Sequence, residues 1–232
     1  MASVKFKDQL DAANKLIEIL PKKELNDAKT IVLCMSLESV ILTDVVCRGL
    51  NLSYEMLFSE PIPAPNNSEC DVAIVSETED IVLNDPLIKV FNISYDYIYG
   101  EAHRKYEEKI LKNVYKYRKG NLIGELKGKN ILLIDEGCET GMTALICIKT
   151  LLDVKVKSIS YATPMIATDV FANLNDMVDE IYTINKIVDF IDVDSYYEKK
   201  IEATSERIMS ILEESPHYLP LQKQQGDKNN AI

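Results

Sequence analysis

The fold is decided by the stretch Ile131–Thr143, which reads Ile-Leu-Leu-Ile-Asp-Glu-Gly-Cys-Glu-Thr-Gly-Met-Thr. Its four leading aliphatic residues predict a short strand buried on both faces, as in parallel sheets. Two acids follow at once, and a loop containing Gly141 opens a largely apolar run that predicts a helix. Ligands of such folds bind at the carboxyl ends of the strands, so we expect the site at this loop.

The loop carries the groups that a phosphate needs. The first N–H groups of a helix have no partner within the helix, and the helix dipole favours negative charge there. Gly141 would let the backbone approach an anion without a Cβ in the way. We therefore expect a phosphate to be held by backbone amides and by two threonine hydroxyls of this segment, namely Glu139, Thr140, Gly141, Met142 and Thr143.

The acids Asp135 and Glu136 would be repelled by a phosphate unless they face hydroxyls or a hard cation. Ribose hydroxyls and Mg²⁺ are such partners, which makes both acids candidate substrate and metal ligands. The alternative is that the acids and Thr140 only cap the following helix and that the loop is an ordinary strand-to-helix turn. The Thr-Gly-x-Thr pattern at this offset favours the phosphate interpretation.

Alternating strand and helix patterns extend over the rest of the chain and predict an α/β fold with a doubly wound, mainly parallel sheet. We expect strands over 31–35, 54–58, 71–75, 130–134, 156–162 and 180–184, and helices over 6–20, 40–50, 142–152 and 166–174. The helix over 40–50 should close at Gly49. The strand over 156–162 should end at Thr163–Pro164.

Four further segments have distinct patterns. Prolines in 61–68 predict a turn that cannot pair regularly, and 81–83 with 88–93 predict a small hairpin. The charged, tyrosine-rich segment 95–119 predicts an exposed helical excursion. After about Ser205 we expect a polar helix and then a frayed Gln/Asn/Lys-rich end over 222–230.

Composition limits the class of protein. With 232 residues, 47% of them apolar, the chain suits one domain with a short tail. A net charge of −11 argues against a nucleic acid or an anionic membrane as partner. Because no apolar run approaches the roughly 18 residues of a membrane span and Met1–Lys7 lacks the core of a secretory signal, we expect a cytoplasmic protein. The five cysteines lack metal-site spacing and should be buried free thiols.

The pattern Asp135-Glu136, three variable residues, then Thr140-Gly141-x-Thr143 resembles the signature of the type I phosphoribosyltransferases. The resemblance implies that the acids hold Mg²⁺ and the ribose hydroxyls of phosphoribosyl pyrophosphate, and that residues 139–143 hold its 5-phosphate. Looser matches over roughly residues 5 to 200 resemble a little-characterised bacterial branch of predicted phosphoribosyltransferases. They include Phe6-Lys7-Asp8, Ala64-Pro65-Asn66, Val82-Leu83-Asn84 and Tyr196-Tyr197-Glu198.

The resemblance also implies a domain organisation, with a phosphoribosyltransferase-like domain over 1–205 and a C-terminal helix and polar tail over 206–232. Within the domain, a lid excursion would occupy about 95–119 and a small hood about 185–200. A homodimer is expected from the base rate of oligomers.

Five side chains take candidate roles from this resemblance. Glu139 lies where 6-oxopurine enzymes carry a general base, and Arg104 and Lys105 would belong to the lid. Phe190 could stack on a planar base, and Lys186 could contact a carbonyl or a phosphate. The alternatives are a solvated loop acid, a solvated charge run and an aromatic ring used only for packing.

The sequence departs from the family where pyrophosphate should bind. Family members present glycine and basic residues after the first strand and a basic residue after the second. Here the first loop is Met35–Ser39, in which Glu38 would repel a diphosphate, and Ser59-Glu60 follows the second strand.

Two functions therefore stay open. The first is Mg²⁺-dependent transfer of the phosphoribosyl group to a nitrogenous base or other acceptor. The second is a non-catalytic regulatory protein that binds a nucleotide or another ribose-5-phosphate compound. A dinucleotide-binding reductase is a weaker third reading, because no GxGxxG opens a helix.

Overall fold

The computed structural model describes residues 5–222, which fold around a five-stranded parallel sheet. The strand order is β2-β1-β6-β7-β8, and the strands are β1 (Ile31–Cys34), β2 (Ser53–Met56), β6 (Asn130–Ile134), β7 (Ser158–Ala167) and β8 (Glu180–Ile187). From β1 the chain proceeds to one edge through β2, and from β6 it proceeds to the other edge through β7 and β8. The predicted doubly wound parallel sheet is confirmed.

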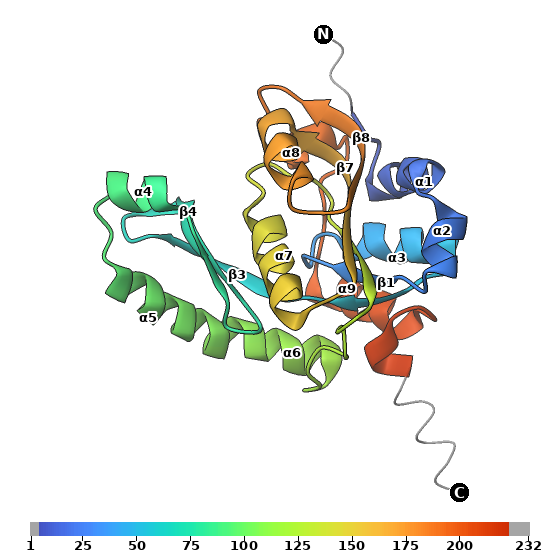
Figure 1. Ribbon diagram of the computed structural model, residues 1–232, viewed down its shortest axis with the longest axis horizontal. Coiled ribbons are helices and arrows are strands. Elements are labelled where there is room, and N and C mark those ends of the chain that lie inside the picture. The colour runs from blue at the N-terminus through green and yellow to red at the C-terminus, as the bar shows by residue number, and fades with distance from the viewer. Residues whose placement is uncertain (1–4, 223–232) are drawn as a thin grey trace, which may run out of the picture.

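Helices cover both faces of this sheet (Figure 1). One face carries α1 (Gln9–Ile19), α2 (Lys22–Asp27) and α3 (Val40–Leu50), and the other carries α7 (Met142–Val154) and α8 (Thr168–Asn175). The aliphatic run Ile131–Ile134 of β6 explains this layering, because successive side chains of a strand point to opposite faces. Leu132 and Ile134 pack into the first core, while Ile131 and Leu133 pack into the second.

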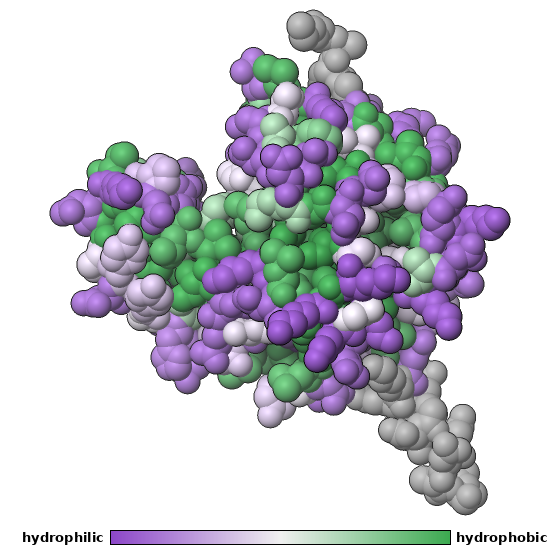
Figure 2. Space-filling model, viewed as in Figure 1, coloured by the Kyte–Doolittle hydropathy of each residue, from purple (hydrophilic) through white to green (hydrophobic). Residues whose placement is uncertain are grey.

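Residues 59–118 form an arm that projects from this body (Figure 1). The antiparallel strands β3 (Ser59–Ala64), β4 (Asn67–Ser76) and β5 (Ile81–Leu83) are followed by α4 (Asp85–Val90), α5 (Tyr95–Lys105), a π-helical turn (Tyr106–Ile110) and α6 (Leu111–Arg118). On the face shown in Figure 2, apolar side chains gather over α7 and the adjoining part of the arm. The predicted helical excursion is confirmed.

Two predictions within the arm are wrong. The segment around Pro61 and Pro63 pairs with β4 as strand β3, with register shifts next to Pro63. Prolines at alternate positions leave their missing N–H groups on one side, which an edge strand tolerates. The expected hairpin is also absent, since Asn84 caps α4 by accepting a hydrogen bond from the backbone of Leu87 at 3.3 Å, with Pro86 in the first turn.

Several predicted boundaries also differ, two of them at a proline or a glycine. Strand β7 continues through Pro164 to Ala167 instead of ending there, and the last turn of α3 is closed by Asn51 in the left-handed conformation instead of by Gly49. Asparagine tolerates that conformation better than most residues with a side chain.

The C-terminal segment is part of the core rather than a polar appendage. Helix α9 (Ser205–Glu214) buries Ile208 and Leu212, and Tyr218 beyond it is fully buried. The Tyr218 ring lies 5.2 Å from the ring of Tyr54, and its hydroxyl donates to a backbone oxygen at 3.1 Å. The predicted tail beyond residue 222 lies outside the described residues.

Two other expectations can be compared with residues 5–222. No helix in this part of the chain is long and apolar enough to cross a membrane. All five cysteines are free thiols; four of them are buried and Cys70 is half-buried.

We expect Tyr218→Ala to lower the free energy of unfolding by about 3 kcal/mol, because it removes a buried aromatic ring and a hydrogen bond. Thermal and urea unfolding followed by circular dichroism measure this loss. Tyr115→Ala is the matched control, since that side chain is 74% exposed and its removal should be nearly neutral. Equal stability of the two variants would show that the segment after α9 does not contribute to the core.

Candidate functional site

The candidate site lies where the strand order reverses. β1 and β6 are neighbours in register, with Cys34 opposite Ile134, so the loops that follow them face each other. After β1 the next strand, β2, lies on one side, whereas after β6 the next strand, β7, lies on the other side. The position between β1 and β6 is therefore the topological switch point of the sheet. Open α/β sheets bind their ligands at such a point.

The acid pair stands at the end of β6. Asp135 is only 6% exposed, and Glu136 is half-buried. The Ser36 hydroxyl donates to Glu136 Oε2 at 2.8 Å and lies 3.4 Å from Asp135 Oδ1. The Tyr197 hydroxyl donates to the backbone oxygen of Glu136 at 2.7 Å. Burial and then the charge of Glu136 raise the pKa of Asp135, so a cation or hydroxyl donors here would favour its charged form.

The following loop presents hydrogen-bond donors to a cavity. Within residues 5–222, the backbone N–H groups of Glu139, Thr140, Thr143 and Ala144 donate to no other protein group. The loop lines a cavity of about 190 Å³ together with Asp135, Glu136 and Val193. Open N–H groups at the start of a helix can receive an anion, and the anion pocket at α7 stays a prediction.

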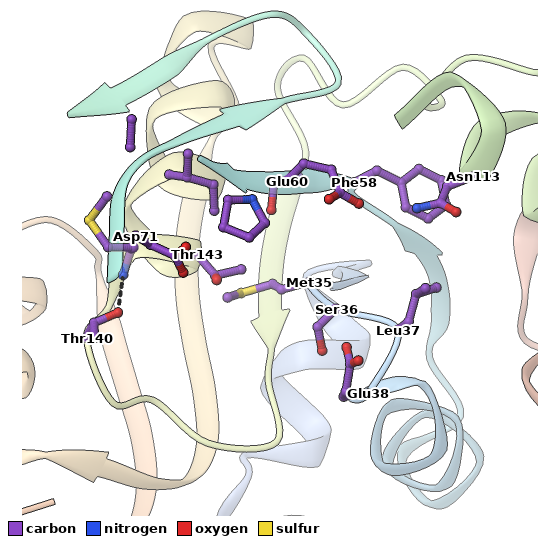
Figure 3. A pocket seen from close by; sticks show the side chains of 15 residues that line it. Met35, Ser36, Leu37, Glu38, Phe58, Glu60, Asp71, Asn113, Thr140 and Thr143 are labelled. Carbon is purple, nitrogen blue, oxygen red and sulfur yellow. Dashed lines mark hydrogen bonds between the residues drawn. The ribbon is translucent and has the colours of Figure 1, made fainter. Parts of the chain in front are cut away.

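A second cavity adjoins the first, and we call it the acidic chamber. It encloses about 380 Å³ between the loop after β1, strands β3 and β4, and α7. Thr140 and Thr143 lie on one side, and Ser36, Leu37 and Glu38 lie on the opposite side (Figure 3).

The chamber owes its name to three carboxyls. Among its lining residues Glu38, Glu60 and Asp71 are acidic, and none is lysine or arginine. Partial burial raises the pKa of each of the three, and the positive charge of Lys105 in the arm offsets part of the rise at Glu60 and Asp71. The chamber therefore favours positive or neutral groups over anions.

The comparisons with known proteins concern structure alone, because no protein-family model and no curated protein matches the sequence. The chain is similar to the protein TT1426 from Thermus thermophilus, with a TM-score of 0.72 and 24% identity, over 91% of this chain and 99% of that one. This similarity extends over nearly the whole of both folds. Together with the strand order and the acid pair at the end of β6, it decides the fold.

The fold is that of the type I phosphoribosyltransferases. More distant similarities include a hypoxanthine phosphoribosyltransferase of Trypanosoma cruzi, with a TM-score of 0.47 and 11% identity over 86% of this chain and 88% of that one. They also include a hypothetical protein from Neisseria gonorrhoeae with bound ppGpp, with a TM-score of 0.40 and 11% identity over 89% and 93%.

Within this phosphoribosyltransferase fold, several predicted site residues come together. Asp135, Glu136 and the segment from Glu139 to Thr143 line the smaller cavity, and Thr140, Met142 and Thr143 also line the acidic chamber. The Glu139 side chain is exposed to solvent over much of its surface. Partial desolvation of its carboxyl raises its pKa, and the negative charge of Asp192 raises the pKa further.

The other candidates lie apart from both cavities. Arg104 is bound by Glu101 and Glu108 of its own helical segment. The Lys186 ammonium lies 3.1 Å from the centre of the Phe171 ring, and the Phe190 ring packs 4.9 Å from that of Tyr196. Their roles, like those of Lys105 and Glu139, stay predictions.

The site residues that sequence reasoning missed include Ser36, Asn113 and Tyr197. Ser36 follows a predicted strand at the carboxyl edge of the sheet, a position that marks it as a candidate. Asn113 and Tyr197 come from α6 and from the segment after β8, and only the folded chain brings them here.

We expect Gly141→Ala to destabilise the protein and distort the anion pocket. Gly141 has φ +73°, and an added Cβ would lie 2.7 Å from Val170 Cγ1 of α8. Two effects act at Gly141, the left-handed backbone and the contact with Val170, and Gly128→Ala separates them. Gly128 has φ +70° but open space around it, so this substitution should lower the free energy of unfolding by about 1 kcal/mol through backbone strain alone.

Urea unfolding measures the difference in free energy of unfolding between the two variants. Gly100→Ala is the reference, because Gly100 lies within helix α5 and has neither a left-handed backbone nor a close neighbour. A Gly141 variant no less stable than the Gly128 variant would contradict close packing of the loop on α8.

Proposed function

We propose that this protein binds the ribose 5-phosphate group of a small molecule at the end of β6. One observation carries the proposal: the open N–H groups and the threonine hydroxyls at the start of α7 line the same cavity as Asp135 and Glu136. The amides and hydroxyls suit a phosphate, and the paired carboxylates suit the hydroxyls of the attached sugar.

We include Mg²⁺ in this proposal, with Asp135 and Glu136 as its protein ligands. Mg²⁺ is commonly held by one or two carboxylates, with phosphate oxygens of the substrate and water completing its shell. Residues 5–222 contain no group of three or more His, Cys, Asp or Glu side chains suited to a metal. A pair of acids beside a phosphate pocket fits a Mg²⁺ site in which the substrate supplies the remaining ligands. When bound, Mg²⁺ would supply positive charge against a pyrophosphate group.

The first candidate activity is transfer of the phosphoribosyl group from phosphoribosyl pyrophosphate to a nitrogenous base or other acceptor. Asp135 and Glu136 would orient the ribose, and residues 139–143 would hold the 5-phosphate. Glu139, with its raised pKa, would accept the proton of the attacking nitrogen. Arg104 and Lys105 of the arm would act as lid cations, and Lys186 and Phe190 would bind the acceptor.

The acidic chamber favours a second candidate, a non-catalytic protein that binds a nucleotide or another ribose-5-phosphate compound. A diphosphate next to the phosphate loop would meet Glu38, Glu60 and Asp71 without a lining cation. Repulsion of this kind weakens binding of the leaving group and of the transition state. For either function we expect a cytoplasmic protein, which could form a homodimer, with the domain limits given above.

We expect Thr140→Ala/Thr143→Ala to weaken binding of ribose 5-phosphate at least about tenfold, because both hydroxyls line the pocket and hydrogen bonds to a charged group are strong. Isothermal titration calorimetry measures the affinity. Thr168→Ala is the control, since this exposed threonine of α8 lines neither cavity. Unchanged affinity in the double variant would remove the phosphate from this loop.

The two candidate activities separate in a second titration series. Phosphoribosyl pyrophosphate with Mg²⁺ is compared with ribose 5-phosphate and with nucleoside monophosphates, and release of pyrophosphate is assayed with a panel of bases. Tighter binding of the pyrophosphate compound and its turnover support the transferase. Equal affinities without pyrophosphate release support the non-catalytic protein.

We expect Glu60→Gln to strengthen binding of inorganic pyrophosphate roughly fivefold, because it removes one negative charge from the chamber wall. Affinity should also rise as the pH falls through the raised pKa values of Glu38, Glu60 and Asp71, since protonation neutralises them. Glu69→Gln, an exposed change outside the chamber, should have no such effect. Identical titrations of the two variants would place pyrophosphate elsewhere.

A further inference from the structure

Ser36 connects the two cavities and touches both acids. It follows β1 by two residues and lines the acidic chamber as well as the smaller cavity. Its hydroxyl donates to Glu136 Oε2 at 2.8 Å, and Asp135 Oδ1 lies 3.4 Å away. A hydroxyl has one proton to donate, so the shorter contact to Glu136 is the principal bond.

The Ser36 hydroxyl is itself held in place by the next turn. The backbone N–H of Ser39 donates to Ser36 Oγ at 2.9 Å, and the Ser39 hydroxyl donates back to the Ser36 carbonyl at 3.1 Å. Ser39 is fully buried beside α3. With an acceptor site of Ser36 Oγ used by Ser39, the hydroxyl proton is directed towards the acids.

Glu136 is thereby fixed from two sides. Ser36 holds its carboxylate, and Tyr197 holds its backbone oxygen at 2.7 Å. Tyr197 is itself anchored, with its ring 5.7 Å from that of Phe6. Two neighbouring carboxylates repel each other, so a free Glu136 side chain would swing away from Asp135 towards solvent.

The bond from Ser36 uses one oxygen of Glu136 and leaves Oε1 for a ligand. In the part of the chain that the structure describes, the donors from Ser36 and from the backbone of Glu136 go to Glu136 Oε2 and Asp135 Oδ1, and the two carboxyls also interact with each other through a side-chain hydrogen bond. A pair of adjacent hydroxyls on one ligand could therefore donate to both acids while Ser36 stays in place.

We infer that Ser36 is a positioning residue that holds Glu136 for the 2-hydroxyl of the sugar and so sets a preference for ribose over 2-deoxyribose. This rests on the proposed binding of ribose 5-phosphate. The loop after β1 lacks the glycine and basic residues expected for pyrophosphate, and through Ser36 it contributes to binding of the sugar instead. Ser36→Ala should leave the Glu136 side chain mobile and so reduce the increase in affinity that the 2-hydroxyl provides.

The test is a calorimetric comparison of ribose 5-phosphate with 2-deoxyribose 5-phosphate. Wild type should bind the ribose ester about tenfold more tightly, the typical effect of one hydrogen bond to a charged group. Ser36→Ala should reduce this ratio at least about threefold, with little change for the deoxyribose ester, and Ser36→Thr should restore it because the hydroxyl is kept. Ser210→Ala is the matched control, since Ser210 also donates to a carboxylate, that of Glu214, at 2.8 Å on the exposed face of α9.

Each outcome is decisive. If Ser36→Ala weakens both esters equally, the serine has only a structural role and the inference is overturned. If Ser36→Ala leaves both affinities as they are in wild type, the inference also fails while the proposed function stands. If wild type binds neither ester, the proposed function and the inference fail together.

Discussion

Two consecutive carboxylates stand at the end of β6, where the sheet is packed by helices on both faces. Burial raises the pKa of Asp135, and its neighbour Glu136 adds like-charge repulsion. Such a pair is tolerated where donors stabilise it, and distant segments supply them. The Ser36 hydroxyl after β1 donates to the Glu136 carboxylate, and the Tyr197 hydroxyl after β8 donates to the backbone oxygen of Glu136. The loops at this edge of the sheet therefore place hydrogen-bond donors beside the acid pair, as burial of two neighbouring acids requires.

The arm determines the shape of the neighbouring chamber. At its base, Arg118 of α6 is fully buried, forms an ion pair with Glu77 and lies 5.0 Å from the centre of the Phe58 ring. Glu77 in turn accepts a hydrogen bond from the backbone of Phe58 at 3.1 Å. Because breaking a buried ion pair is costly, this contact holds Phe58 and Glu60 in the chamber wall. The same arm carries Lys105 near two of the chamber acids, so any change in arm position would alter the charge that a ligand meets.

Local patterns predicted most of the elements and failed at identifiable places. The strand Asn130–Ile134 was predicted with its bounds, because the four aliphatic residues after Asn130 can be buried on two faces. The proline-rich strand β3 was missed because its pairing depends on being at an edge, which is a property of the assembled sheet. The burial of Tyr218 was not predicted, because its partner Tyr54 lies far away in the sequence.

The sequence by itself determined the class of fold and predicted the place of the candidate site, because periodicity, the acid pair and Thr140-Gly141-x-Thr143 are local properties of neighbouring residues. Tertiary structure alone decided which donors hold Glu136, that Gly141 packs on Val170, and that three acids from separate segments face one cavity. These features depend on the distances between side chains that are far apart along the chain. Such distances are set by strand order and helix packing rather than by the pattern of any one segment.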